Sequence, residues 1–133
     1  RGINAELMTD LQFARSEAVQ RKNRVKVTFA SNAAFSCYSI YTVDVECDCT
    51  ATPRCPVGAT ELKHVSVPVS TTVVLTPARA VVFDPARGEA LQDFSINVFS
   101  TRSGRLTTSV NKIGPVRVCS PDGSITGVPT PCP

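Results

Sequence analysis

The order of the predicted elements constrains this chain most, because one long helix comes first and only strands and loops follow it. Between residues 3 and 18, apolar side chains recur at spacings of three and four, the periodicity of one helical face. This packing face consists of Ile3, Leu7, Leu11, Ala14 and Ala18. Charged residues, among them Glu6 and Asp10, occupy much of the remaining surface. The pattern predicts an amphipathic helix over residues 3–22, which needs a partner surface to be stable.

After Asn23 the periodicity changes to the alternation of half-buried strands. Segments rich in valine, threonine and aromatic residues, which favour pleated sheet, alternate with turn-forming glycine, proline, asparagine and serine. The predicted strands are residues 24–30, 35–45, 62–69, 71–75, 80–83, 94–100, 105–110 and 116–119. We therefore expect one α+β domain over residues 1–133, in which the helix packs on antiparallel sheet. Its parts would be the helix 3–22, a β-rich body 24–119 and a disulfide-bounded tail 119–133.

The six cysteines indicate an oxidising compartment, because reduced cytosolic proteins of this size seldom carry so many. The chain contains no run of the ~20 apolar residues that a membrane span requires, and it does not open with the pattern of a signal peptide. We therefore expect an exported protein whose targeting segment lies upstream, so that Arg1 is a truncation point. The net charge of +3 permits attraction to polyanions without requiring it.

Four cysteines lie close together in the first half of the chain. Cys47 and Cys49 are too near one another to bridge comfortably in an extended segment. We therefore expect Cys37 to pair with one of these two and Cys55 with the other, in either arrangement. The alternative is a zinc site built from Cys47, Cys49, Cys55 and His64, although their spacing matches no familiar zinc motif.

The remaining two cysteines bracket a tail in which proline and glycine exclude regular structure. A bridge between Cys119 and Cys132 would close a loop of about 14 residues and contribute about 3 kcal/mol of stability. The alternative is that each of them pairs elsewhere. We expect the Cys119–Cys132 bridge.

Residues that could support catalysis are scarce. His64 is the one histidine of the chain, and no Ser-His-Asp or Cys-His arrangement is indicated by spacing. Glycine-rich phosphate-binding motifs are absent from the sequence. We therefore predict no enzymatic activity, no metal and no cofactor.

A group of basic residues lies on the last predicted hairpin and the strand that follows it. They are Arg102, Arg105, Lys112 and Arg117. If they share one face, they could follow a phosphate backbone without reading its bases. The alternative is a solvated basic edge, which discourages aggregation between sheets.

Three segments resemble the GspH/FimT group of minor pilins and pseudopilins. Residues 10–21, DLQFARSEAVQR, resemble the group's helical "LxxARSEAxxR" motif, which is the most specific of the three. Residues 83–88, FDPARG, resemble its "FxPxG" turn. Residues 114–119, GPVRVC, resemble its glycine-initiated, arginine-containing final strand.

The resemblance implies a globular head preceded by a leader peptide and a hydrophobic half-helix, which anchors such proteins in the inner membrane before packing into a filament. It implies a non-catalytic subunit that initiates, caps or decorates a type IV pilus or a type II secretion pseudopilus. Its partners would be other pilin or pseudopilin subunits, in a periplasmic or extracellular filament. The disulfide-bounded C-terminal loop of type IV pilins resembles the segment between Cys119 and Cys132.

Two alternatives remain open at this stage. Some FimT-type minor pilins are associated with DNA capture through a "GRxR" motif, which corresponds here to residues 114–117. Proline replaces the first arginine of that motif, so only Arg117 carries over. The second alternative is a secreted, disulfide-rich binding module that merely shares the helix pattern.

Overall fold

A helix and two antiparallel sheets make up the described part of the molecule. In this computed structural model, the structure describes residues 2–42, 46–52, 54–55, 60–68, 73–76, 80–100, 104–110 and 116–119, and for residues 2–5, 73, 100, 104 and 117–119 it describes the backbone alone. The elements are α1 (Gly2–Arg21), β1 (Val25–Ser31), β2 (Phe35–Thr42), β3 (Thr60–Pro68), β4 (Val73–Thr76), β5 (Ala80–Phe83), β6 (Phe94–Ser100), β7 (Gly104–Val110) and β8 (Val116–Cys119).

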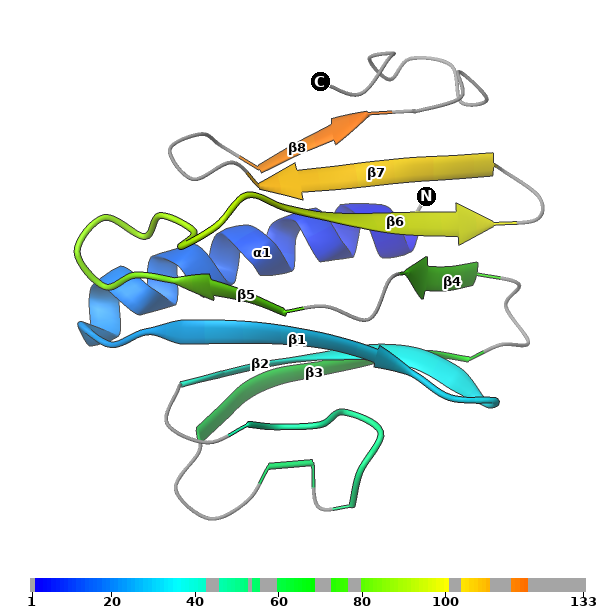
Figure 1. The fold of residues 1–133 in the computed structure, drawn as a ribbon, viewed down its shortest axis with the longest axis horizontal. Coiled ribbons are helices and arrows are strands. Elements are labelled where there is room, and N and C mark those ends of the chain that lie inside the picture. The colour runs from blue at the N-terminus through cyan, green and yellow to red at the C-terminus, as the bar shows by residue number, and fades with distance from the viewer. Residues whose placement is uncertain are drawn as a thin grey trace.

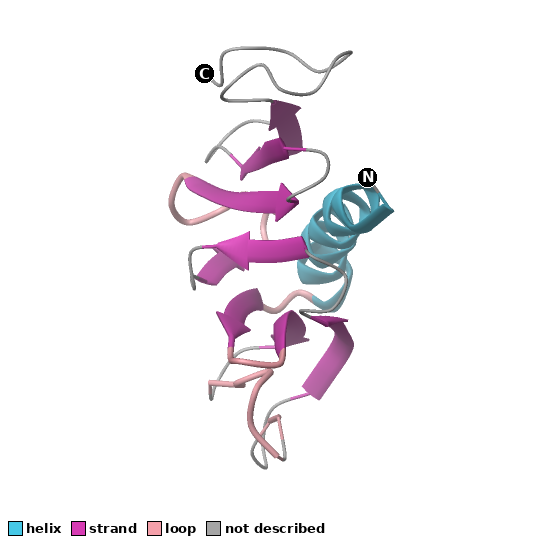
Figure 2. Cartoon of the chain, turned by 90° about the vertical axis from the view of Figure 1, so that its right-hand side faces the viewer, coloured by secondary structure: helices cyan, strands magenta, loops and turns pink. Residues whose placement is uncertain are grey.

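The strands form one layer, and α1 lies on one face of it (Figures 1 and 2). One four-stranded sheet has the order β3-β2-β1-β5 and the other the order β4-β6-β7-β8. Every pairing within them is antiparallel. The predicted fold class, an N-terminal helix packed on antiparallel sheet, is therefore confirmed. The described strands match the predicted segments to within two residues; the predicted strand residues 43–45, 69 and 71–72 lie outside the described part.

The packing face of α1 supplies the centre of the core. Leu7, Leu11, Ala14 and Ala18 are fully buried, as the periodicity predicts. The side chain of Ile3, the fifth predicted member, lies outside the described part. The helix contacts β1 and β5 in one sheet and β7 and β8 in the other, so one core extends across both sheets. Burial of each leucine contributes roughly 1.5–3 kcal/mol relative to exposure.

The end of α1 is defined by a Schellman motif. The N–H of Asn23 donates to the carbonyl of Ala18 at 3.2 Å, and the N–H of Lys22 donates to the carbonyl of Val19 at 3.3 Å. Lys22 adopts the left-handed conformation with a φ of 54°. These bonds satisfy carbonyls that the helix leaves without partners and turn the chain into β1.

Asp10 corrects one expectation from the sequence. The helical pattern assigns it to the charged, solvated surface, but it is 2% exposed and faces the sheet. Its carboxylate accepts hydrogen bonds at 2.6 Å from the hydroxyl of Tyr38 on β2 and from the Nζ of Lys63 on β3. Because both partners satisfy the carboxylate, a charged group is tolerated beneath the helix.

Candidate interaction surfaces

Two disulfides fasten the loop between β2 and β3. The structure pairs Cys37 with Cys49 and Cys47 with Cys55, which is one of the two arrangements that the spacing left open. Because all four sulfurs form disulfides, the alternative zinc site has no thiolate to supply and is ruled out.

This clamped loop covers the side of β2 that faces away from α1. Neighbouring positions of a strand face opposite sides, so Cys37, Ser39 and Tyr41 share the outer side, and each is fully buried. Cys47 and Cys49, which come from the loop, are buried above them at 2% and 3% exposure. The loop lies beside the β3 end of the layer (Figure 1).

Ion pairs add to the clamp. Lys26 of β1 pairs with Glu46 at the start of the loop, and the hydroxyl of Tyr41 donates to Glu46 at 3.1 Å. Arg54 near the end of the loop forms a two-pronged pair with Glu61 of β3, at 2.9 and 3.0 Å. Hydrogen bonds from Lys26 and Arg54 lower the pKa values of Glu46 and Glu61, respectively. These exposed pairs contribute orientation more than stability.

The two predicted clusters in the last third of the chain are described only in part. Cys132, Arg102 and Lys112 lie outside the described residues, as do the side chains of Cys119 and Arg117. Of the predicted basic group, the structure therefore describes one side chain, that of Arg105, which is exposed. The register of β7 and β8 places position 117 opposite Ser109. Positions 105, 109 and 117 thus share the side of the sheet opposite to the buried residues of β7.

His64 lies opposite Ser39 in the pairing of β2 with β3, and Glu61 is close to both. The Ser39 hydroxyl is fully buried and donates to Glu61 at 3.2 Å rather than to the imidazole. Burial and the Arg54 guanidinium lower the pKa of His64, whose Nε2 has no hydrogen-bond partner among the described residues. A serine that no substrate can reach does not act as a nucleophile, so this trio fulfils a packing role.

The structure brings two of the resembling motifs together. The turn at residues 84–89 is closed by Asp84, whose N–H donates to the carbonyl of Glu89 at 2.9 Å and whose carboxylate accepts the N–H of Arg87 at 2.8 Å. Gly88 has a φ of 69° and lies on α1, where an added Cβ would meet the Cγ of Arg15 at 2.9 Å. The turn therefore docks on the "ARSEA" segment, and glycine is required both by conformation and by space.

The outward side of α1 retains two large apolar residues. Phe13 is 37% exposed and Val19 is 42% exposed, although both belong to the helix that supplies the core. Within the described residues, no helix is long and apolar enough to span a bilayer. The helical pattern did not single out these two positions. It separates the buried positions from the exposed ones, but it does not show which of the exposed positions contact a partner.

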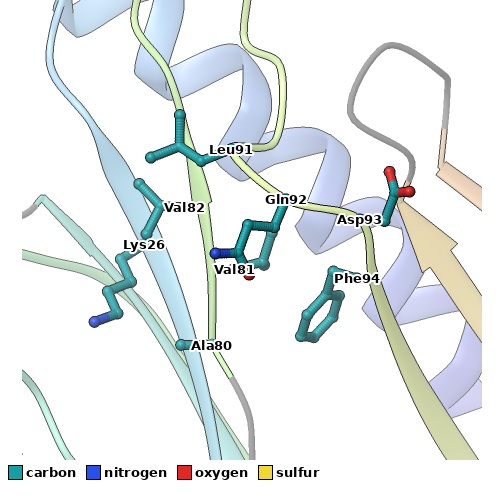
Figure 3. A pocket seen from close by; sticks show the side chains of 8 residues that line it. All are labelled: Lys26, Ala80, Val81, Val82, Leu91, Gln92, Asp93 and Phe94. Atoms are coloured by element: carbon teal, nitrogen blue, oxygen red, sulfur yellow. The ribbon is translucent and has the colours of Figure 1, made fainter.

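A cleft opens where the two sheets diverge (Figure 3). β5 pairs with β1, whereas β6 pairs with β4 and β7, and near the turn a single bridge joins Phe83 to Ala90. Beyond that bridge the chains separate and leave a space of about 270 Å³. Its lining comprises Lys26, Ala80, Val81, Val82, Leu91, Gln92, Asp93 and Phe94. These mainly apolar groups offer no arrangement for acid–base or nucleophilic chemistry.

One helix on antiparallel sheet, with a loop held by disulfides, is the architecture of a pilin-like domain. The crystal structure of the type IV minor pilin FimU from Pseudomonas aeruginosa has the same fold, with a TM-score of 0.63 and 18% sequence identity over 97% of this chain and 91% of that one. The sequence profile of the family described as "Type II transport protein GspH" matches residues 5–114. The chain belongs to this GspH family, which the helical motif indicated. A search of curated proteins finds no significant match.

Proposed function

We propose that this protein is a structural minor subunit of a type IV pilus, acting in initiation, at the tip or in assembly. The observation that carries the proposal is the division of α1 into two sides. One side is fully buried against the sheets, while the other retains exposed Phe13 and Val19. Isolated exposed apolar residues are common, but two on the helix that pilin-like subunits use for assembly suit contact with neighbouring subunits.

The chemistry of the described residues supports a non-catalytic role. The described cysteines are engaged in disulfides, and Ser39 beside His64 is buried. The clamped loop and the docked turn give a rigid surface, which suits a subunit that is recognised by others. In this proposal an apolar helical segment continuous with α1 anchors the subunit in the inner membrane before assembly.

Matched substitutions test the filament role in the native host. Phe13→Glu and Val19→Glu place a charge on the outward side of α1. Phe99→Glu on β6 and Leu91→Glu in the connection between β5 and β6 place it at similarly exposed positions away from the helix, at 44% and 42% exposure. We expect the helix variants to be lost from sheared filaments and the Phe99 and Leu91 variants to be retained, at equal cellular levels. Equal incorporation of all four would contradict the proposal.

Two further measurements separate the related alternatives. Deletion of the gene should remove surface pili if the subunit belongs to a pilus, and should block protein secretion if it belongs to a type II pseudopilus. The codons upstream of Arg1 should encode a short basic leader and ~20 apolar residues. A conventional signal peptide there would favour the secreted binding module instead.

DNA binding is the second candidate function, and the strand register favours it. Exposed Arg105 and position 117 lie on one side of neighbouring strands. The test is a fluorescence anisotropy titration with duplex DNA at several salt concentrations. Arg105→Glu and Arg117→Glu should each weaken binding and reduce the slope of log K against log salt concentration by about 1. Arg24→Glu, a charge reversal beyond the end of α1, is the control. Binding that is equally sensitive to all three reversals would contradict a site on β7 and β8.

A further inference from the structure

We propose that a hollow on the outward side of α1 binds the carboxylates of an acidic peptide segment. The hollow lies between the helix and the turn at residues 84–89 and has a volume of about 500 Å³. It is lined by Gln12, Arg15, Ser16, Val19, Gln20 and Arg87. It is thus formed where the "ARSEA" segment and the "FxPxG" turn meet.

The two arginines in this hollow have no counter-charge within the part of the chain that the structure describes. Among the described residues, no ion pair or side-chain hydrogen bond engages the guanidinium of Arg15 or Arg87. Two acids flank Arg87 in the turn: Glu89 forms no ion pair with it among the described residues, and Asp84 uses its carboxylate to accept the backbone N–H of Arg87. In contrast, Arg21, six residues further along α1, is paired with Glu17 at 2.7 Å. Two unpaired cations that line one hollow repel each other until an anion binds between them.

The surrounding contacts hold the site in shape. The stem of Arg15 packs against Gly88, where an added Cβ would lie only 2.9 Å from its Cγ. Gln12, Ser16 and Gln20 follow at four-residue spacing, so they form one row of hydrogen-bonding groups along the helix. Val19, which is 42% exposed, adds an apolar wall.

The position of the hollow on α1 and its apolar wall favour carboxylate over phosphate. Phosphate sites commonly use helix N-termini and successive backbone N–H groups, whereas this hollow lies along the C-terminal half of α1, whose dipole opposes a doubly charged anion more strongly than a singly charged one. An arginine fork binds carboxylate and phosphate alike in a two-pronged geometry, so the preference for carboxylate comes from the helix dipole and from Val19, which suits the methylene stem of a glutamate.

The length of the site suits a peptide. The row from Gln12 to Gln20 spans about 12 Å at 1.5 Å per residue, the length of about four residues of extended chain. An acidic segment of this length places one carboxylate near each arginine. Its backbone N–H and C=O groups can then form hydrogen bonds with the side chains of the glutamine–serine row. This inference concerns the isolated protein and a soluble peptide, so it stands or fails separately from the filament role.

The test is a titration of the ¹⁵N-labelled protein with hexaglutamate at low ionic strength, followed by the NMR shifts of residues 12–20 and 84–89. The variants are Arg15→Gln and Arg87→Gln, with Arg24→Gln as the control. Arg24 is an exposed cation that forms no ion pair with any described residue, and it does not line the hollow. Because Arg87 lies in an exposed turn, its variant stays informative if Arg15→Gln disturbs the packing on Gly88.

We expect saturable shifts at the hollow and a loss of affinity of about tenfold in each of the two hollow variants, the effect of one charge-assisted hydrogen bond. The control should lose less than about twofold. An equal loss in all three variants would show diffuse attraction and overturn the site. So would the absence of shifts at millimolar hexaglutamate, or tighter binding of inorganic pyrophosphate than of the peptide in the same hollow.

Discussion

The carboxylate of Asp10 in α1 accepts a hydrogen bond of 2.6 Å from the hydroxyl of Tyr38 in β2, and neither residue is more than 2% exposed. Lys63 of β3 donates to the other oxygen of the same carboxylate at 2.6 Å. The helix is thereby joined to two strands of the first sheet by polar contacts beneath its apolar face. The cluster fixes the rotation of α1 on the sheet, because a turned helix would leave a buried charge unpaired.

Replacement of Asp10 should therefore destabilise the protein more than the removal of an apolar side chain of similar size would. We expect Asp10→Ala to lower the free energy of unfolding by about 3 kcal/mol, since it leaves the Tyr38 hydroxyl buried without a partner. Tyr38→Phe should cost about 1–2 kcal/mol. Urea denaturation followed by circular dichroism measures both. Glu6→Ala is the control, because Glu6 is 44% exposed and lies 3.6 Å from Lys63; a loss there equal to that of Asp10→Ala would contradict the buried-cluster account.

The same contact predicts a loss of stability in alkali. Burial, together with the hydrogen bond to Asp10, raises the pKa of Tyr38 well above its ordinary value of 10.0. The unfolded chain releases this proton near pH 10 while the folded protein retains it, so stability is full below pH 10 and falls as the pH rises beyond it. The slope should approach 1.4 kcal/mol per pH unit for this group.

Denaturant midpoints measured from pH 8 to 11.5 test the slope, and Tyr38→Phe should make it shallower. Absorbance of tyrosinate should rise only as the protein unfolds, because burial also raises the pKa of Tyr41. A titration of Tyr38 near pH 10 in the folded protein would refute the expected burial.

The sequence predicted the helix and the strands well, because the periodicity of each element depends on residues that are close together along the chain. The three-and-four spacing identified Leu7, Leu11, Ala14 and Ala18, all fully buried. The burial of Asp10 could have been suspected, since it lies three residues after Leu7 and four before Ala14, on the edge of the same stripe. Polarity argued against it, because the partner that makes its burial tolerable comes from 28 residues away along the chain.

The surfaces were harder to predict than the core. The approach of the turn at residues 84–89 to Arg15 depends on how β5 and β6 leave the two sheets, and a local pattern does not encode that path. The spacing of the cysteines limited the inner disulfides to two arrangements. The choice between them depends on which loop cysteine lies over Cys37. That position depends on contacts between the loop and the strands, such as those of Glu46 with Tyr41 and of Arg54 with Glu61.

Removal of the inner disulfides should loosen the clamped loop more than the sheets. Cys37 and Cys49 are 12 positions apart, and Cys47 and Cys55 are 8 apart. On the chain-entropy model the first bridge contributes about 3 kcal/mol and the second about 2.5 kcal/mol. We expect Cys37→Ser/Cys49→Ser to lower the unfolding free energy by the larger amount. Hydrogen exchange should rise in residues 46–55 while β6 and β7 stay protected; uniform loss of protection would show that the loop supports the whole fold.

Gly88 should tolerate no side chain. Its φ of 69° disfavours other residues, and a Cβ would approach the carbonyl oxygen of Arg15 to 3.0 Å. We expect Gly88→Ala to cost about 1–3 kcal/mol, since both the turn and its contact with α1 must shift. Ala86→Ser, at an exposed position of the same turn, should change stability by less than about 0.5 kcal/mol. Thermal unfolding of the two variants compares them directly, and similar melting temperatures would argue against close docking of the turn on the helix.

Lys22 offers the opposite test, a substitution that should stabilise the protein. It occupies the left-handed position of the Schellman motif with a φ of 54°, where glycine is preferred because it has no Cβ. Lys22→Gly should raise the unfolding free energy by about 0.5–1 kcal/mol, the relief of backbone strain being partly offset by the greater freedom of glycine in the unfolded chain. Arg21→Gly, one position earlier and still helical, should instead destabilise by about 1 kcal/mol, because glycine is a poor helix former and the pair with Glu17 is lost. Opposite signs in urea denaturation would establish where the helix ends, whereas destabilisation by both variants would place Lys22 inside the helix.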